Sequence, residues 1–178
     1  TSDQRIHILK LEAKHRLQAR TLTPLTKESG AYVSVTPDAT GLRTLSELAI
    51  ALGVVTDVDK LHCTLSYAKN CFPTAGADNC LRFGAKIVGI EFWDGHDNDG
   101  YLVVKFDSPD LEARNRFWAS HGLKHSFDDY TPHSTLVSKL EKTPELIIRI
   151  GKVVRIAYGR SITFTNEIIE GIKPSSKD

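Results

Sequence analysis

At 178 residues, 40% hydrophobic and 25% charged, the chain is long enough to bury the core of one globular domain. Its formal net charge of +1 argues against bulk binding of a long nucleic acid, although a small nucleotide needs only a local positive pocket. The chain has three cysteines, an odd number, and they lack Cys-x-x-Cys spacing: Cys63, Cys71 and Cys80. Neither a disulfide framework nor a structural zinc site is therefore expected. No stretch approaches the roughly 20 apolar residues of a membrane span. We therefore expect a cytoplasmic protein.

Residues 1–30 are expected to form an N-terminal extension. Within positions 1–20, basic residues are interleaved with apolar ones in a pattern that fits neither period cleanly, and an amphipathic helix or an added strand is favoured. The stretch 21–30 contains proline and ends in glycine, which is typical of a loop. Residues 31–178 are then expected to form a single domain.

The first half of that domain is predicted to be strand, helix, strand. Residues 31–35 are rich in β-branched and aromatic side chains, which predicts a strand. Thr36-Pro37-Asp38 predicts a helix start, with the threonine as cap and the proline at the first helical position. Apolar residues then recur at three- and four-residue steps as far as Gly53, which can end the helix in a left-handed conformation. Residues 62–67, His-Cys-Thr-Leu-Ser-Tyr, follow as a predicted strand and are called the first motif.

Between the halves, residues 68–84 predict a long surface loop able to line or cover a site. A strand is predicted at 85–93, followed by a turn at 94–100 whose Gly, Asn and Asp residues are typical of a hairpin. Calcium binding at this acidic turn is disfavoured because the turn lacks the downstream glutamate and the spacing of an EF-hand.

The second half repeats the first. Residues 101–106 predict a strand and Ser108-Pro109-Asp110 a helix start. That helix is expected to run to Gly122, and a loop then leads to His-Ser-Thr-Leu-Val-Ser at 133–138, the second motif. The helix-start proline precedes the motif histidine by 25 residues in the first half and by 24 in the second, which indicates a duplication.

The C-terminal part predicts one more helix start and two strands. Thr143-Pro144-Glu145 has the pattern of a helix start. Residues 153–158 and 161–172 are predicted strands, and in the latter Thr163, Thr165 and Glu167 would alternate onto one face. Two halves related by a pseudo-twofold axis would face each other across a cleft, with both motifs at its floor.

Because side chains alternate along a strand, His62 and Thr64 should share one face of the sheet, as should His133 and Thr135. A single His-x-Thr would more often be a strand with a polar edge than a site. The pattern recurs at equivalent places of a repeat, and this favours one shared catalytic site.

Two imidazoles suit proton transfer near neutral pH, because histidine titrates at about 6.5. In cleavage of a ribonucleotide phosphodiester, a neutral histidine can take the 2′-hydroxyl proton while a protonated one donates to the departing 5′-oxygen. The hydroxyls of Thr64 and Thr135 would stabilise charge on the non-bridging oxygens. The sequence offers no clustered metal ligands, so no cofactor is expected.

The paired His-Cys-Thr-Leu and His-Ser-Thr-Leu segments resemble the two-histidine phosphoesterase superfamily, which includes RNA 2′,3′-cyclic phosphodiesterases, RNA ligase-like proteins and phosphodiesterases of 2′-5′ oligonucleotides. The resemblance covers most of residues 31–172. It implies an α+β fold in which duplicated strand-helix-strand halves form a bilobal sheet with a central cleft.

Within that superfamily, four segments resemble the phage anti-CBASS nucleases. They are Gly30-Ala-Tyr-Val, Leu45-Ser-Glu-Leu-Ala, Leu61-His-Cys-Thr-Leu-Ser-Tyr and Tyr130-Thr-Pro-His-Ser-Thr-Leu. Those enzymes degrade the cyclic di- and trinucleotide messengers of bacterial antiphage immunity without a metal.

The resemblance implies that His62, Thr64, His133 and Thr135 are catalytic. It further implies three substrate-binding residues, namely Tyr32 against the ligand, Trp93 stacked on a base, and a C-terminal glutamate, for which Glu167 is preferred to Glu170.

Each of the three has a plainer interpretation. Tyr32 and Trp93 also fit strand residues that pack the core, and Glu167 an exposed strand residue. The histidines at positions 96, 121 and 125 are assigned to surface or helix-end roles.

The resemblance thus predicts a metal-independent phosphodiesterase that cleaves 3′-5′ bonds of cyclic di- or trinucleotides and so counters bacterial antiphage immunity, in the host cytoplasm if the chain is phage-encoded. Two alternatives stay open. One is an RNA 2′,3′-cyclic phosphodiesterase or RNA-processing enzyme of the same superfamily, and the other a protein that sequesters cyclic nucleotides without cutting them. The expected partner is a cyclic oligonucleotide, with no membrane and no long nucleic acid.

Overall fold

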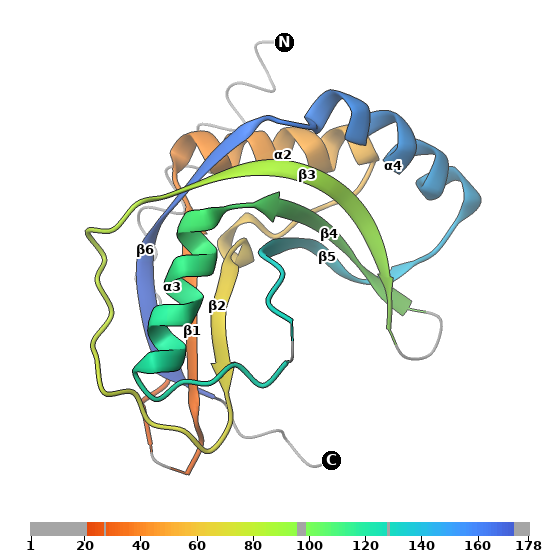
Figure 1. The fold of residues 1–178 in the computed structure, drawn as a ribbon. Helices are drawn as coiled ribbons and strands as arrows, with labels where there is room; N and C mark the ends of the chain where they lie inside the picture. The colour runs from red at the N-terminus through yellow and green to blue at the C-terminus, as the bar shows by residue number, and fades with distance from the viewer. Residues whose placement is uncertain (1–20, 27, 96–98, 128, 173–178) are drawn as a thin grey trace.

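The computed structural model describes residues 21–26, 28–95, 99–127 and 129–172 (Figure 1). These residues form one six-stranded antiparallel sheet and three α-helices, so the predicted α+β class is confirmed. The strands are β1 (Ala31–Pro37), β2 (Cys63–Ala68), β3 (Phe83–Asp94), β4 (Asp99–Asp107), β5 (His133–Glu141) and β6 (Ser161–Gly171). The helices are α2 (Ala39–Leu52), α3 (Pro109–Ser120) and α4 (Pro144–Ala157), with a short 3-10 helix, η1, at Val58–Lys60. The first 20 residues of the predicted extension lie outside the described residues.

The strand order β2-β1-β6-β3-β4-β5 places the two motif strands at opposite ends of the sheet. Each predicted half has the expected order of elements, β1-α2-β2 and β4-α3-β5, and in each half the two strands are antiparallel neighbours. The central pair, β6 and β3, joins the halves along the sheet. The order therefore reads the same from either end: motif strand, companion strand, central strand.

The sheet curves strongly, and its two edge strands, β2 and β5, lie side by side although they are far apart in the strand order (Figure 1). The Ser134 hydroxyl of β5 donates a 2.8 Å hydrogen bond to the backbone carbonyl of His62, just before β2. Among the described residues, side chains rather than a backbone ladder join the two edges. This contact is what brings the two motifs together.

The helices cover the sheet and complete the core. Helices α2 and α4 pack on each other and against β6 and β3, respectively, and α3 packs on β2 and β3 (Figure 1). The buried residues of α2 recur at three- and four-residue steps, as predicted, and Gly53 ends the helix at φ 72°. Within the described residues, no helix is both long and apolar enough to cross a membrane.

The three predicted helix starts are present, with one change of cap. The hydroxyls of Ser108 and Thr143 accept hydrogen bonds from backbone N–H groups of the first turns of α3 and α4, each with proline at the start. At α2 the predicted cap, Thr36, is wrong. Strand β1 continues through Pro37, paired with β6, and the carboxylate of Asp38 caps the helix by accepting from Gly41 N at 2.8 Å.

The strand predicted at 153–158 is wrong, because residues 153–157 form the last turns of α4 and Tyr158 is its C-cap. The β-branched run suggested a strand locally. However, the buried residues of the helix, Leu146, Val153 and Ala157, are seven and four residues apart, which is the spacing of one helical face. The strand predicted at 161–172 is confirmed as β6.

Candidate functional site

The alternation predicted within both motifs is confirmed. His62 and Thr64 are half-buried, and the two residues between and after them, Cys63 and Leu65, are fully buried. The second motif has the same pattern, with half-buried His133 and Thr135 alternating with buried Ser134 and Leu136. Each motif thus presents a histidine and a threonine on an accessible face and uses the intervening residues for packing.

Three contacts of these intervening residues and their neighbours join the two motifs. Besides the bond from Ser134 to the His62 carbonyl, the Tyr130 hydroxyl donates to the Thr64 carbonyl at 2.9 Å. The Cys63 thiol lies 3.9 Å from the Tyr130 hydroxyl and close to the backbone N–H of His133.

The Cys63 thiol and the Tyr130 phenol, which lie at this contact between the motifs, both stay protonated. Burial raises the pKa of the Cys63 thiol to about 12, although the Tyr130 and His133 contacts act in the opposite sense. Burial, together with the nearby thiol, also raises the pKa of the Tyr130 phenol. Cys63 is therefore a packing residue rather than a nucleophile, and Tyr130 remains a hydrogen-bond donor.

The two imidazoles are oriented in the same way. His62 Nδ1 lies 2.6 Å from the carbonyl oxygen of Lys60, and His133 Nδ1 lies 2.8 Å from that of Thr131. Because a carbonyl only accepts, each Nδ1 carries a hydrogen, and Nε2 is the nitrogen that exchanges a proton in the neutral ring. In both motifs the residue two positions before the histidine fixes its tautomer.

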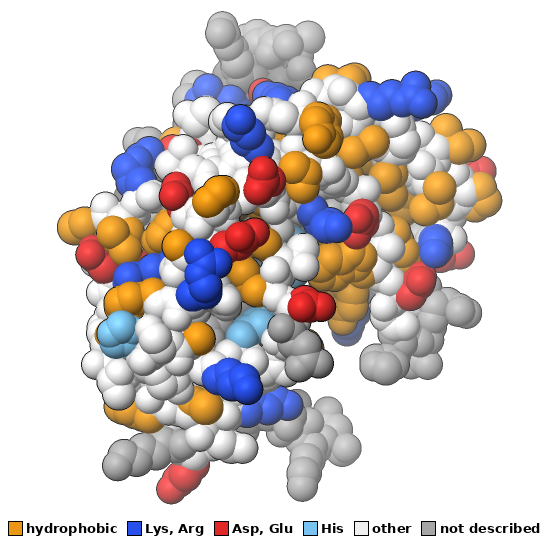
Figure 2. Space-filling view, in the orientation of Figure 1, with side chains coloured by type: hydrophobic (Ala, Val, Ile, Leu, Met, Phe, Trp, Pro, Cys, Tyr) orange, Lys and Arg blue, Asp and Glu red, His pale blue; other side chains and the backbone are white. Residues whose placement is uncertain are grey.

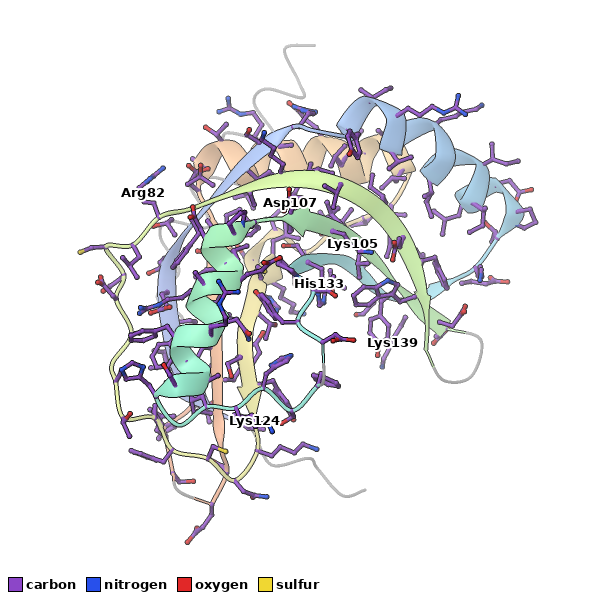
Figure 3. The ribbon with its side chains drawn as sticks, in the orientation of Figure 1. Arg82, Lys105, Asp107, Lys124, His133 and Lys139 are labelled. Carbon is purple, nitrogen blue, oxygen red and sulfur yellow. The ribbon has the colours of Figure 1, made fainter. Side chains whose placement is uncertain are left out.

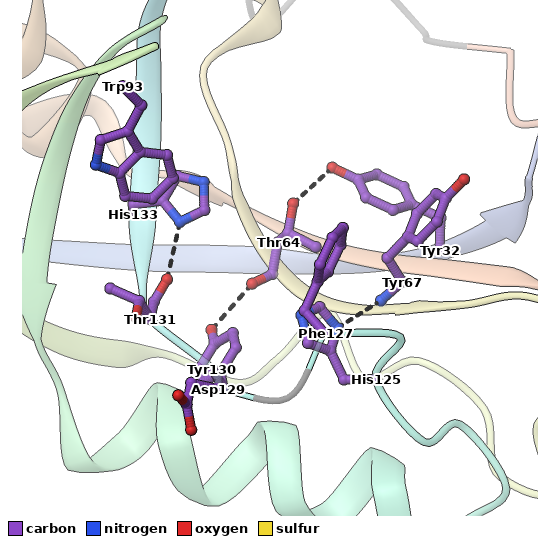
Figure 4. A pocket seen from close by; sticks show the side chains of 10 residues that line it. All are labelled: Tyr32, Thr64, Tyr67, Trp93, His125, Phe127, Asp129, Tyr130, Thr131 and His133. Carbon is purple, nitrogen blue, oxygen red and sulfur yellow. Dashed lines mark hydrogen bonds between the residues drawn. The ribbon is translucent and has the colours of Figure 1, made fainter. Parts of the chain in front are cut away.

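A cavity of about 410 Å³ lies where the motifs meet (Figure 4). It is lined by Tyr32, Thr64, Tyr67, Trp93, His125, Phe127, Asp129, Tyr130, Thr131 and His133. In the space-filling view, hydrophobic side chains gather at a hollow in this face, with acidic and basic side chains around it (Figure 2). The lining is thus largely aromatic, with a few polar groups, as in small-molecule sites.

Of the four predicted catalytic residues, Thr64 and His133 line the cavity directly. His62 adjoins it, since its ring meets that of Tyr32 edge-on with centroids 6.0 Å apart. Thr135 is not among the lining residues and follows His133 on the same face of β5. The structure therefore places two of the four in the cavity lining, His62 against the lining residue Tyr32, and Thr135 beside His133 on β5.

Tyr32 lines the cavity instead of packing the core. Its hydroxyl shares a 2.9 Å hydrogen bond with the Thr64 hydroxyl, from the neighbouring strand. Tyr32 thus contacts both members of the first His-x-Thr pair, the histidine through its ring and the threonine through its hydroxyl.

Trp93 is likewise a cavity residue, and its ring lies 4.6 Å from that of His133, centroid to centroid, at 57°. The indole N–H donates to Glu91 at 2.8 Å, and Glu91 also accepts from Lys105, the cross-strand neighbour of His133 (Figure 3). These hydrogen bonds, first that of Trp93 and then that of Lys105, lower the pKa of the Glu91 carboxyl. The ionised carboxylate therefore holds the indole in place beside the histidine.

Glu167 lies elsewhere. It is buried beneath α3, where its carboxylate accepts two 2.7 Å bonds from Arg114 and 3.0 Å bonds from Trp118 Nε1 and the backbone N–H of Asp78. It does not line the cavity and is not exposed. Its position makes it a buried link between β6, α3 and the loop before β3.

The face predicted for Glu167 is wrong because β6 contains a bulge. Asn166 has φ 55°, and the pairing with β1 shifts between Thr165 and Ile168. The shift turns Glu167 away from the face of Thr165. Glu170 is the cross-strand neighbour of Tyr32, so this second glutamate is the one that shares the face of a cavity residue.

His125 lines the cavity, so the surface or helix-end role predicted for it is wrong. The backbone N–H of Tyr67 donates to its Nδ1 at 3.0 Å. Burial, and next the nearby charge of His133, lower the pKa of His125. The helix-end role of His121 is confirmed by its position as the C-cap of α3, whereas His96 is outside the described residues.

The loop predicted to line a site contributes no lining residue within the described chain; the segment between α3 and β5 does so instead. Nothing in the sequence shows which of these two loops lines the cavity, because that depends on which of them forms hydrogen bonds with β2 in the folded chain. In the described parts of the chain, no group of three or more His, Cys, Asp or Glu side chains is placed to hold a metal ion.

The fold and site define a class: an α+β protein of two strand-helix-strand halves, whose edge strands each bring a residue of a His-x-Thr motif to one aromatic cavity. Residues 29–178 match the model of the family described as "Anti-CBASS protein Acb1", and the chain belongs to this family. The predicted resemblance to phage anti-CBASS proteins is thereby confirmed.

Relatives of the same description come from several phages. The protein of Enterobacteria phage T4 is 33% identical over 110 residues, which cover 61% of this chain and 71% of that protein. The protein of Vibrio phage KVP40 is 29% identical over 117 residues, or 65% and 76% of the two chains. That of Yersinia phage phiR1-RT is 31% identical over 109 residues, or 60% and 70%.

Proposed function

We propose that this protein counters CBASS, a bacterial antiphage immunity, as a metal-independent phosphodiesterase that cleaves 3′-5′ bonds of cyclic di- or trinucleotides. Membership of the family and the similarity to phage anti-CBASS proteins support the anti-CBASS role. The observation that carries the enzymatic part is the matched orientation of His62 and His133, each with Nδ1 on a backbone carbonyl, on strands that touch. The symmetric strand order supports a bilobal two-histidine phosphoesterase architecture.

In the proposed reaction, Nε2 of one neutral histidine takes the proton of the ribose 2′-hydroxyl. The 2′-oxygen attacks the phosphorus, the bond to the 5′-oxygen breaks, and the second, protonated histidine donates its proton to that leaving oxygen. The product is a 2′,3′-cyclic phosphate. Water then opens it to a 3′-phosphate, with the two histidines in exchanged roles.

Thr64 and Thr135 would hold the non-bridging phosphate oxygens. The hydrogen bond that Thr64 shares with the Tyr32 hydroxyl supports this role: when the tyrosine is the donor, the threonine keeps its own hydrogen for the phosphate. A donor fixed before the substrate arrives stabilises developing charge without reorganisation.

Trp93, held beside His133 by Glu91, offers a surface on which a base can stack. The cavity supports no ligand contact for Glu167, which is buried under α3.

The test is incubation of the protein with cyclic GMP-AMP or cyclic tri-AMP in EDTA, followed by chromatography. We expect linear products ending in 3′-phosphate. Unchanged nucleotide with measurable binding would instead indicate sequestration, and loss of activity on chelation would contradict the metal-independent mechanism.

Two further substrates sharpen the test. A nucleotide with 2′-deoxyribose at the cut position should resist cleavage, and an equal rate on it would rule out attack by the 2′-oxygen. Faster turnover of RNA ending in a 2′,3′-cyclic phosphate than of cyclic nucleotides would favour the RNA-processing alternative.

A further inference from the structure

The segment between α3 and β5 supplies half of the cavity lining and is fixed on the outer edge of β2. The backbone N–H of Ser126 donates to the Tyr67 carbonyl at 2.9 Å, and the Tyr67 N–H donates to His125 Nδ1 at 3.0 Å. Both backbone groups of Tyr67 therefore bond this segment. Farther along, the Tyr130 hydroxyl bonds the Thr64 carbonyl. The segment is thus a preformed wall of the cavity.

His125 is held in one neutral form at this wall. Because its Nδ1 accepts from a backbone N–H, the hydrogen of the neutral ring is on Nε2. The ring lies in the cavity lining, so Nε2–H is a donor available to a ligand. An uncharged donor of this kind suits an uncharged acceptor, such as a ring nitrogen or carbonyl oxygen.

Phe127 completes an aromatic surface next to this donor. Its side chain is 64% exposed although it belongs to the cavity lining. The Phe127 ring lies 6.3 Å from that of Tyr67, at 34°, and 5.3 Å from that of His125. Figure 4 shows these three rings on one side of Thr64 and Trp93, with His133, on the other.

We infer that Phe127, Tyr67 and His125 form a second nucleobase subsite, across Thr64 from Trp93, where a base stacks on Phe127 and accepts a hydrogen bond from His125 Nε2–H. The inference rests on the proposed function, since it deepens the account of the same substrate. Two aromatic surfaces on either side of Thr64, one of them next to His133, match a ligand whose two bases are joined through phosphates.

The test uses the full chain and a phosphorothioate cyclic dinucleotide, with binding measured by calorimetry. Phe127→Leu should weaken binding by about 5- to 150-fold, the range expected for loss of one base stack. Phe72→Leu is the matched control, because Phe72 is also an exposed phenylalanine, 45% accessible, but does not line the cavity. The control should bind like the wild type.

Two analogues that each lack one base locate the effect. With the analogue that lacks the base bound at Phe127, Phe127→Leu should not weaken binding further, whereas Trp93→Leu still should. With the analogue that lacks the base bound at Trp93, only Phe127→Leu should weaken binding. Equal binding of the dinucleotide by wild type and Phe127→Leu would overturn the subsite and leave the proposed function intact. A wild type that neither binds nor cleaves cyclic nucleotides would overturn both.

His125→Phe tests the donor, because it keeps a flat ring and removes Nε2–H. We expect binding to weaken about 2- to 10-fold, the range for one neutral hydrogen bond. Melting temperature monitors the fold, since the variant also leaves the Tyr67 N–H without its acceptor. Unchanged affinity in a folded His125→Phe variant would contradict the role of this donor.

Discussion

Ser134 Oγ donates a 2.8 Å hydrogen bond to the backbone carbonyl of His62, and this bond joins the two motif strands across the open edges of the sheet. The serine is fully buried, so the carbonyl has little access to water once the hydroxyl is gone. The second residue of one motif therefore controls the position of the first residue of the other.

Ser134→Ala should accordingly lower the free energy of unfolding by about 1 to 3 kcal/mol, the cost of leaving a buried polar group unpaired. Turnover should fall as well, because the spacing of the two imidazoles is less well fixed. Ser138→Ala, at an exposed position of the same strand, is the control. Denaturant melts and single-turnover rates measure both effects. A fully stable and fully active Ser134→Ala would contradict the proposed importance of the bond.

Removal of either histidine should stop the reaction. We expect His62→Ala and His133→Ala each to lower turnover by about 100- to 10,000-fold, as for loss of a general acid or base. The wild type should show a bell-shaped pH profile. Both side chains are only half-buried, so the folded state should persist, as circular dichroism would show.

His121→Ala is a suitable control because that histidine ends α3 and lies outside the cavity. It should keep wild-type turnover. Retention of more than about a tenth of the activity by either motif variant would be incompatible with acid-base catalysis by the pair.

Glu167→Gln should act on stability rather than on ligand binding. Its carboxylate is fully buried and pairs with Arg114, and removal of one charge of a buried pair costs about 3 to 5 kcal/mol. Thermal melts should show the loss. Where the variant is folded, its dissociation constant for the phosphorothioate analogue should match that of the wild type. A weaker ligand affinity at unchanged stability would instead restore the substrate contact predicted for Glu167 from the sequence.

His125 should make stability depend on pH. Burial and the charge of His133 lower its pKa in the folded state, so the unfolded chain binds the proton more readily. The stability that comes from keeping His125 neutral is fully present above the pKa of histidine in the unfolded chain, about 6.5. It is lost as the pH falls from there toward the lower pKa of His125 in the folded state. His125→Gln should flatten that part of the curve of unfolding free energy against pH. An unaltered curve would show that other groups cause the acid sensitivity.

The duplicated motifs could be predicted from the sequence because strand alternation and the strand-helix-strand order are local patterns. That each motif histidine shares a face with its own threonine followed from residue parity alone. The contact between the two motif strands could not be predicted in detail, since it depends on the curvature of a six-stranded sheet.

Three features of the structure could not be predicted from the sequence, each for a different physical reason. The helical face of α4 outweighed a local β-branched run at 153–158. The left-handed residue Asn166 changed the parity of β6 and with it the face of Glu167. His125 reached the cavity because its loop bonds the edge of β2, a tertiary choice that leaves no periodic signal.

The bond between Ser134 and His62 spans 72 positions of the chain. During synthesis the first histidine therefore leaves the ribosome well before its counterpart, and under the proposed mechanism the nascent amino-terminal half would lack one of the two imidazoles. Under the same proposal, proteolytic nicking between β2 and β5 would separate the two histidines unless the pieces stay associated, so that activity would require the complete fold.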